Sequence, residues 1–186
     1  MVDDMQGKTV AFLVAPEGVE QVELTEPWRA VESIGVTPCL VSTQAGSVQA
    51  YRHLDRADTF PVEMTVDDVV ADRFDALVLP GGVANPDYLR TIPGAVGFTR
   101  RFFELGKPVA VICHGPWTLV EAGVVDGRSL TSWPSLRTDI SNAGGHWTDK
   151  AVVTCTRGPN TLISSRMPDD LPEFCATLRA ELRGAE

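Results

Sequence analysis

The sequence predicts a three-layer, doubly wound α/β fold, in which a mostly parallel sheet is covered by helices on both faces. Short runs rich in β-branched and other apolar residues recur along the 186-residue chain. These runs are apolar at successive positions rather than alternating, which is typical of strands buried on both faces. Segments with helical spacing separate them, and such alternation of strands and helices favours a parallel sheet.

The N-terminal half contributes three expected strands and one helix. In chain order these are the strand 9–15, the helix 23–34, the strand 37–43 and the strand 60–65. Gly35 ends the helix, as glycine commonly does at a helix C-terminus. Pro61 cannot donate a ladder hydrogen bond, so its strand is expected at an edge or in a hairpin. Residues 44–58 are the least regular and predict a surface loop with a short hairpin.

The C-terminal half continues the same alternation. Its expected elements are the strand 76–80, the helix 94–105, the strand 109–112, the helix 115–123, the strands 129–133, 151–156 and 161–165, and the helix 168–183. Gly81 and Gly82 end the first of these strands, and Gly123 ends the second helix. No repeat or linker divides the chain, so a single domain is expected over residues 1–186, with an ordered core at about 8–183.

Composition and charge exclude several classes of partner. The chain has 16 basic and 25 acidic residues, for a net charge of -9, and no Lys/Arg-rich run, so nucleic acid is not an expected partner. The first eight residues lack the features of a secretory signal, and no apolar run approaches the roughly 18 residues that span a bilayer. No membrane association and a cytoplasmic location are therefore expected.

The four cysteines predict neither a disulfide framework nor a metal site. They lie far apart, without a C-x-x-C pair, and His53 and His146 have no metal-ligand spacing with other residues. We therefore expect Cys39, Cys155 and Cys175 to be structural and both histidines to lie on the surface. The Pro-Gly-Gly segment is no phosphate-binding loop, because no lysine or G-x-G-x-x-G pattern accompanies it.

Cys113 is different, because it stands where a buried strand stops and a helix begins. The segment 107–117 reads KPVAVICHGPW, with Gly115 and Pro116 opening the helix. A thiol on such a turn lies beside the free amides and the positive dipole end of the helix, which both favour the thiolate. The sequence thus predicts Cys113 as a nucleophile at the carboxyl edge of the sheet, where ligands bind in open α/β folds.

Several further segments resemble one family. Glu23 stands four residues before Pro27, and the chain contains LVLPGG, NPDYLR, AVICHGPW, TSWPSLRTDISNAGGHW and SSRMPDDLPEF in that order. Together they resemble the PfpI intracellular-protease family, of the superfamily that includes the parkinsonism-associated deglycase and the class I glutamine amidotransferase-like proteins. The resemblance covers nearly the whole chain. It implies a flavodoxin-like sheet with a nucleophile elbow after a central strand.

The resemblance also implies roles for individual residues. Cys113 matches the family nucleophile, and Glu23 matches a carboxyl that hydrogen-bonds its sulfur; burial near a thiolate would favour the protonated form of Glu23. The amides of Gly82 and His114 match an oxyanion hole. The alternatives are a plain helix-start carboxylate for Glu23 and a tight turn for Gly82. Glu20, one turn earlier, is either a supporting group or a solvated acid.

His114 needs an acid to act as a base. Neighbours on a tight turn usually point apart, so its ring need not contact the Cys113 thiol. The resemblance implies an acid from an adjoining subunit, here Asp87, where many relatives carry the longer glutamate. His114 as a plain helix-start residue and Asp87 as a local cap are the alternatives. A late H-x-E pair is absent, which argues against glutamine amidotransferase activity.

Three functions remain open from the sequence. The first is glyoxalase- or deglycase-type stress protection, in which Cys113, Glu23 and His114 act on small carbonyls or glycated amines. The second is an intracellular cysteine protease or amidase with a Cys113-His114-Asp87 triad formed across subunits. The third is a redox-sensing stress protein or chaperone. No metal or organic cofactor is implied, and a homodimer or hexamer is expected.

Overall fold

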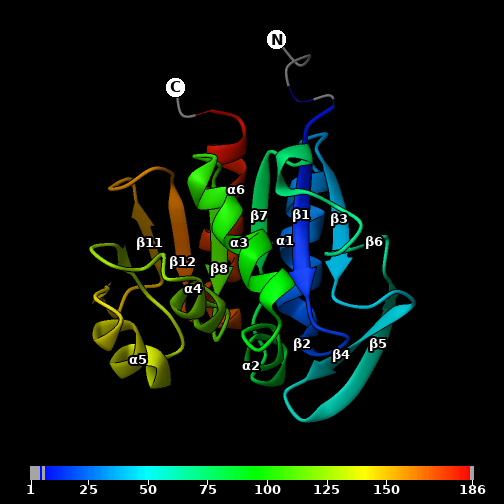
Figure 1. Ribbon diagram of the computed structural model, residues 1–186, viewed down its shortest axis with the longest axis horizontal. Helices are drawn as coiled ribbons and strands as arrows, with labels where there is room; N and C mark the ends of the chain where they lie inside the picture. Colours follow the sequence, from blue (N-terminus) through cyan, green and yellow to red (C-terminus); the bar gives the residue numbers. More distant parts are fainter. Residues whose placement is uncertain (1–4, 6, 185–186) are drawn as a thin grey trace.

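The computed structural model describes Met5 and residues 7–184. Most of the N-terminal stretch in which the sequence indicates no secretory signal therefore lies outside the described residues. A seven-stranded sheet with the order β11-β12-β8-β7-β1-β3-β6 forms the centre of the molecule (Figure 1). Its strands are β1 (Thr9–Val14), β3 (Thr37–Ser42), β6 (Met64–Thr65), β7 (Ala76–Leu79), β8 (Val109–Ile112), β11 (Val152–Cys155) and β12 (Leu162–Ser165).

The strand order confirms the doubly wound, mostly parallel sheet. The chain leaves β1 for β3 on one side, then returns to β7, β8 and β12 on the other, and only β11 pairs antiparallel. Successive connections therefore run in opposite directions from β1, which makes the space between β1 and β7 the switch point. Because β1, β7 and β8 are parallel neighbours, their carboxyl ends lie together at one edge of the sheet, beside this switch point.

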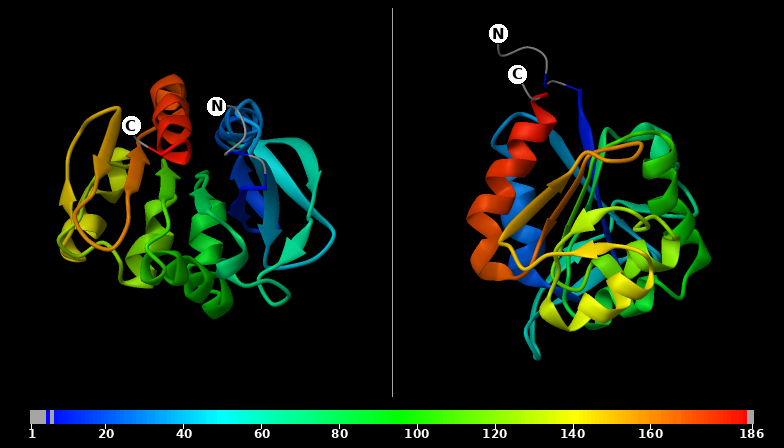
Figure 2. Two further views of the ribbon diagram at one scale, coloured as in Figure 1. Left: turned by 90° about the horizontal axis from the view of Figure 1, so that it is seen from above. Right: turned by 90° about the vertical axis from the view of Figure 1, so that its left-hand side faces the viewer.

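Helices cover both faces, as predicted. Figure 2, seen from above, shows α1 and α6 on one face and α2, α3 and α4 on the other. The helices are α1 (Gln21–Glu32), α2 (Ala84–Leu89), α3 (Pro93–Glu104), α4 (Pro116–Ala122), α5 (Arg137–Asn142) and α6 (Leu171–Leu182), with short 3-10 turns η1 (Ala71–Arg73), η2 (Pro134–Leu136) and η3 (Pro168–Asp170).

The sheet separates two apolar cores. Ala11 and Leu13 of β1 belong to one buried cluster, while Val10, Phe12 and Val14 belong to the other. Adjacent residues of a strand point to opposite faces, so a strand buried on both sides must be apolar at every position. This requirement explains the continuous apolar runs from which the fold was predicted.

The short hairpin predicted within 44–58 is present, but it is longer and more regular than the expected surface loop. Here β4 (Ser47–Arg52) and β5 (Asp55–Pro61) form an antiparallel pair, and β2 (Glu17–Glu20) adds to β4 in a separate three-stranded sheet. Val48 and Ala50 are buried under this sheet. β4 has only two buried apolar residues, Val48 and Ala50, on either side of Gln49, so its alternation is too short to stand out in the sequence.

Several short elements also lie outside the sequence prediction. These are β2, α2, α5 and the two-residue strand β10 (His146–Trp147), which pairs with β9 (Ser129–Leu130). Helices of six residues are too short to show helical periodicity in a sequence. Among the residues that the structure describes, no helix has both the length and the apolar character needed to cross a bilayer.

Candidate active site

Cys113 lies at a strained turn between β8 and α4. Its φ of 62° falls in the left-handed region, which costs a non-glycine residue about 1–2 kcal/mol. Two backbone hydrogen bonds hold the turn: the Cys113 N–H donates to Ser165 O at 3.0 Å, and the Cys113 carbonyl accepts from Trp133 N–H at 2.9 Å. The strand-to-helix turn predicted from the sequence is therefore present, and neighbouring segments fix its geometry.

Gly115 allows the turn to pack closely. A Cβ at this position would lie 2.7 Å from the carbonyl oxygen of Leu79 and 2.7 Å from a methyl carbon of Val111. Any side chain here would force α4 away from β7 and β8. The glycine after Cys113-His114 is thus a packing requirement of the elbow.

Glu23 lies in the first turn of α1 and is fully buried. Its Oε2 accepts a hydrogen bond from Gly81 N–H at 2.8 Å, and the carboxyl lies close enough to the Cys113 side chain for each group to shift the pKa of the other. Burial, with a smaller contribution from the nearby charge of Glu20, raises the pKa of Glu23 to about 8. At neutral pH the carboxyl therefore carries a proton that it can share with the Cys113 sulfur.

The Cys113 thiol is almost completely buried, with 6% of the residue exposed. Burial raises the pKa of this thiol, and an ionised Glu23 raises it further, while the N–H groups of Gly82 and His114 lower it. The elbow alone would favour the thiolate, but loss of solvent outweighs that effect in the resting site. A proton on Glu23 removes the neighbouring negative charge, so the thiolate is best tolerated when Glu23 is neutral.

The His114 ring contacts the Cys113 sulfur within the same chain. Its Nδ1 lies 3.2 Å from Sγ, although neighbours on a tight turn usually point apart. The ring is near-parallel to the indole of Trp133, with centroids 5.6 Å apart and planes at 23°, and it also packs against Trp117. Burial lowers the pKa of His114, so the imidazole is neutral and able to accept a proton at neutral pH.

Gly82 places a second backbone N–H near the sulfur. Its φ is 80°, and a Cβ there would collide with the backbone of Gly18 and lie 2.7 Å from Glu20 N. The N–H groups of Gly82 and His114 both lower the pKa of the Cys113 thiol, so both lie near its sulfur. Two amides converging on one atom can stabilise negative charge that develops next to it.

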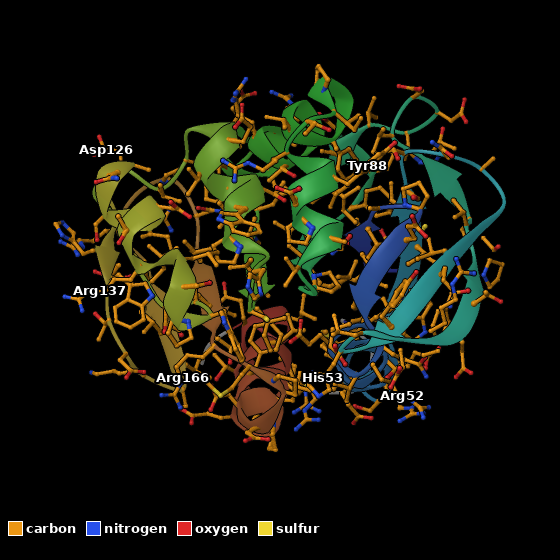
Figure 3. The ribbon with its side chains drawn as sticks, turned by 90° about the horizontal axis from the view of Figure 1, so that it is seen from below. Arg52, His53, Tyr88, Asp126, Arg137 and Arg166 are labelled. Atoms are coloured by element: carbon orange, nitrogen blue, oxygen red, sulfur yellow. The ribbon has the colours of Figure 1, made fainter. Side chains whose placement is uncertain are left out.

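Glu20 is buried and supports the site from β2. Its Oε2 accepts a hydrogen bond from the backbone N–H of His53 at 2.9 Å. His53 has a φ of 57° and occupies the exposed turn between β4 and β5. Its side chain is labelled in Figure 3, which views the molecule from the end where the parallel strands stop. Glu20 thus joins the small sheet to the segment that carries Glu23.

Asp87 is not brought to His114 within the chain. It is exposed on α2 and lines an open pocket with Arg90, Arg100 and Glu121. Its side chain makes no hydrogen bond within the part of the chain that the structure describes. His146 is likewise exposed, on β10.

The contacts of two further residues, Gly81 and Asn85, were not predicted from the sequence. Gly81 donates its N–H to Glu23, and Asn85 is a fully buried side chain of α2. Asn85 accepts from Ala15 N–H at 2.7 Å and donates to the carbonyls of Pro80 and Gly81 at 3.0 Å each. It therefore ties the end of β1 to the Pro-Gly-Gly segment. The asparagine of NPDYLR is visible in the sequence, but its partner strands are not.

Gly81→Ala is expected to disrupt the contact between the nucleophile and its carboxyl. The new Cβ would lie 2.5 Å from Glu23 Oε2 and 2.6 Å from Cys113 Cβ, so both groups must move apart. We expect kcat/KM to fall by roughly 100-fold, since small displacements of reacting groups have effects of this size. The matched control is Gly97→Ala on the exposed face of α3, where a Cβ meets no atom within 4 Å. Equal activity in the two variants would contradict the assignment.

The geometry around Cys113 is that of one class of protein. A buried thiol on a strained elbow, held between a carboxyl and an imidazole and facing two backbone amides, is the arrangement of an α/β enzyme with a cysteine nucleophile. The chain belongs to the DJ-1/PfpI family, whose sequence profile matches residues 8–181. The resemblance identified from the motifs is thereby confirmed.

Two named relatives and one solved structure illustrate this membership. The chain is 41% identical to "Deglycase TK1284" of Thermococcus kodakarensis over 90% of this chain and 98% of the relative. It is 39% identical to "Protein/nucleic acid deglycase 2" of Escherichia coli over 90% and 93% of the two chains. The crystal structure of Drosophila melanogaster DJ-1beta superposes with a TM-score of 0.84 at 28% identity, covering 96% of this chain and 92% of the other.

Proposed function

We propose that the protein is a cofactor-independent enzyme that uses Cys113 to convert small reactive carbonyls, or their early adducts with amines, into harmless acids. The position of the Cys113 sulfur carries this proposal. It lies 3.2 Å from His114 Nδ1, and the Glu23 carboxyl and the amides of Gly82 and His114 lie close enough to shift its pKa. A proton donor, a proton acceptor and an anion site thus surround one nucleophile.

With methylglyoxal as substrate, each group has a defined task. The thiolate adds to the aldehyde carbon, the oxygen takes up a proton, and a hemithioacetal forms. A proton then moves from that carbon to the neighbouring ketone carbon through an enediol, with Glu23 and His114 as the proton carriers. The resulting thioester of lactate is hydrolysed by water, which frees the thiol. The overall reaction, methylglyoxal plus water to lactate, needs no external oxidant or reductant.

An adduct of methylglyoxal with an amine can enter the same sequence. Attack of sulfur at the carbon that bears the nitrogen expels the protonated amine and gives the same hemithioacetal. The products are then the repaired amine and lactate. Both relatives described above bear the name deglycase, and "General stress protein 18" of Bacillus subtilis is 39% identical to the chain, which supports a role in protection from reactive carbonyls.

Lactate formation from methylglyoxal tests the proposal directly. The purified protein is incubated with methylglyoxal with and without EDTA, and lactate is measured enzymatically. We expect lactate at the same rate in both samples and no cleavage of a fluorogenic peptide or casein. Absence of lactate together with peptide cleavage would replace the proposal with the protease alternative. Absence of both, with Cys113 oxidised by low peroxide, would favour the redox sensor.

The exposed position of Asp87 favours a second candidate, a cysteine protease or amidase assembled between subunits. One relative, the "Putative cysteine protease YraA" of Bacillus subtilis, is 35% identical to the chain. In this reading Asp87 of one copy orients His114 of another in a homodimer or hexamer. Asp87→Asn should then lower peptide hydrolysis by roughly 100-fold, while lactate formation changes little. Chromatography with light scattering reports whether the variant keeps its oligomeric state.

The cytoplasmic location stays a prediction, and cell fractionation would check it.

A further inference from the structure

Trp133 lies directly beside the nucleophile, and the proposed reaction gives it no task. Its backbone N–H donates to the carbonyl of Cys113, and its indole lies near-parallel to the His114 ring. It is one of few large apolar side chains on the surface, with 39% of the residue exposed. Pro134 follows and begins η2, so the backbone on both sides of the indole is fixed. A rigid, partly exposed aromatic surface therefore adjoins the reacting sulfur.

The other two tryptophans around the site each hold a guanidinium group. Arg90 lies over the Trp117 ring at 5.6 Å, and Arg137, labelled in Figure 3, lies over the Trp147 ring at 5.7 Å. Both pairs border Trp133: Trp117 contacts the same histidine, and Trp147 Nε1 donates to the hydroxyl of Ser132. Indole faces in this part of the molecule thus bind arginine side chains by cation–π contact.

Trp133 has no such partner among the described residues. The fourth tryptophan, Trp28, packs on Phe12 away from the site, so Trp133 is the indole that is both next to Cys113 and open to a ligand. The chain carries a net charge of -9, which favours the approach of cations. A planar cation fits this surface better than an ammonium group, because it can lie flat on the ring.

We propose that Trp133 is a specificity-determining residue that selects adducts of arginine side chains, by stacking the guanidinium group while Cys113 attacks the carbinol carbon that bears its nitrogen. This inference rests on the proposed function, since it concerns the leaving group of that reaction. It predicts that the protein repairs guanidinium adducts more efficiently than adducts whose leaving group is neither planar nor cationic.

The kinetic test compares two preformed methylglyoxal adducts, those of N-acetylarginine and N-acetylcysteine. Lactate release gives kcat and KM for each adduct with the wild type, Trp133→Leu and Trp133→Phe. We expect Trp133→Leu to lower the arginine-to-cysteine ratio of kcat/KM by about 3- to 30-fold, mainly through KM, as a lost cation–π contact predicts. Trp133→Phe should keep most of the ratio, and Trp28→Leu should leave it unchanged.

The ratio separates a substrate contact from a structural role. If Trp133 only positions His114, Trp133→Leu lowers turnover of both adducts equally, and the inference is rejected. A second measurement stands apart from turnover: saturation-transfer NMR with N-acetylarginine and the neutral, planar N-acetylcitrulline. We expect arginine to bind the wild type more tightly than citrulline and to lose that advantage in Trp133→Leu. Equal binding of the two compounds would overturn the inference even if the proposed function holds. Lack of lactate with normal arginine binding would instead overturn the function.

Discussion

Replacing Cys113 with alanine is expected to abolish turnover of methylglyoxal and of its adducts. The hemithioacetal and the thioester both form on the Cys113 sulfur, and among the described residues no other thiol or hydroxyl is placed between Glu23 and His114. Loss of a nucleophile on which a covalent pathway depends should lower kcat by roughly 10⁴-fold or more. Lactate production over time, with the enzyme in excess to detect a residual single turnover, is the measurement.

Cys175 provides the matched control. This thiol is also buried, with 7% of the residue exposed, and burial raises its pKa to about 11. It lies on α6, on the face of the sheet shared with α1, and the charged groups near it are Arg179 and Glu26. Cys175→Ala should therefore keep its activity, with at most a modest loss of stability. Full activity in Cys113→Ala would show that the elbow cysteine is not the nucleophile.

The central sheet could be predicted because burial on both faces restricts the residue type at successive positions of a strand. β1 and β8 are buried on both faces, and every fully buried position of these two strands carries an apolar side chain. The position of Cys113 could be predicted for a related reason. The apolar run must stop where the chain leaves the sheet, and Gly115 must follow where the turn packs against β7.

Long-range partners could not be predicted from the residues alone. Asn85 belongs to a six-residue helix, and its role depends on β1 and the Pro-Gly-Gly segment meeting it in space. The contact of His114 with its own neighbour depends on the left-handed φ of Cys113, which turns the two side chains toward one another. Neither property is encoded in a local pattern of residue types.

The protonation of the site was only partly predictable. The helix end suggested a thiolate at Cys113, and this argument is correct for an exposed elbow. Burial is a property of the folded molecule, and here it raises the pKa of both Cys113 and Glu23. Burial therefore disfavours the ionised forms of both Glu23 and Cys113, and the two groups can share a proton.

Glu23→Gln is expected to stabilise the protein while it removes activity. Burial raises the pKa of Glu23 to about 8 in the folded chain, whereas an unfolded glutamate titrates near 4.3. A group whose pKa is raised by folding contributes its full stability below the unfolded pKa and loses that contribution as the pH rises through the folded pKa. Between these limits Glu23 lowers the free energy of unfolding by about 1.4 kcal/mol per pH unit, or about 4 kcal/mol at pH 7.

The amide that replaces the Glu23 carboxyl does not titrate, so the difference between variant and wild type should widen from pH 5 to pH 8 and then level off. Chemical denaturation at several pH values measures it, and Glu32→Gln at the exposed end of α1 should show no such widening. The new amide can still accept the Gly81 N–H but cannot deliver a proton to the substrate, so kcat/KM should fall by roughly 10²- to 10⁴-fold. A constant stability difference across this pH range would mean that Glu23 is ionised in the folded protein. A stable, inactive variant would instead show that the buried carboxyl is retained for its proton, at a cost to the stability of the fold.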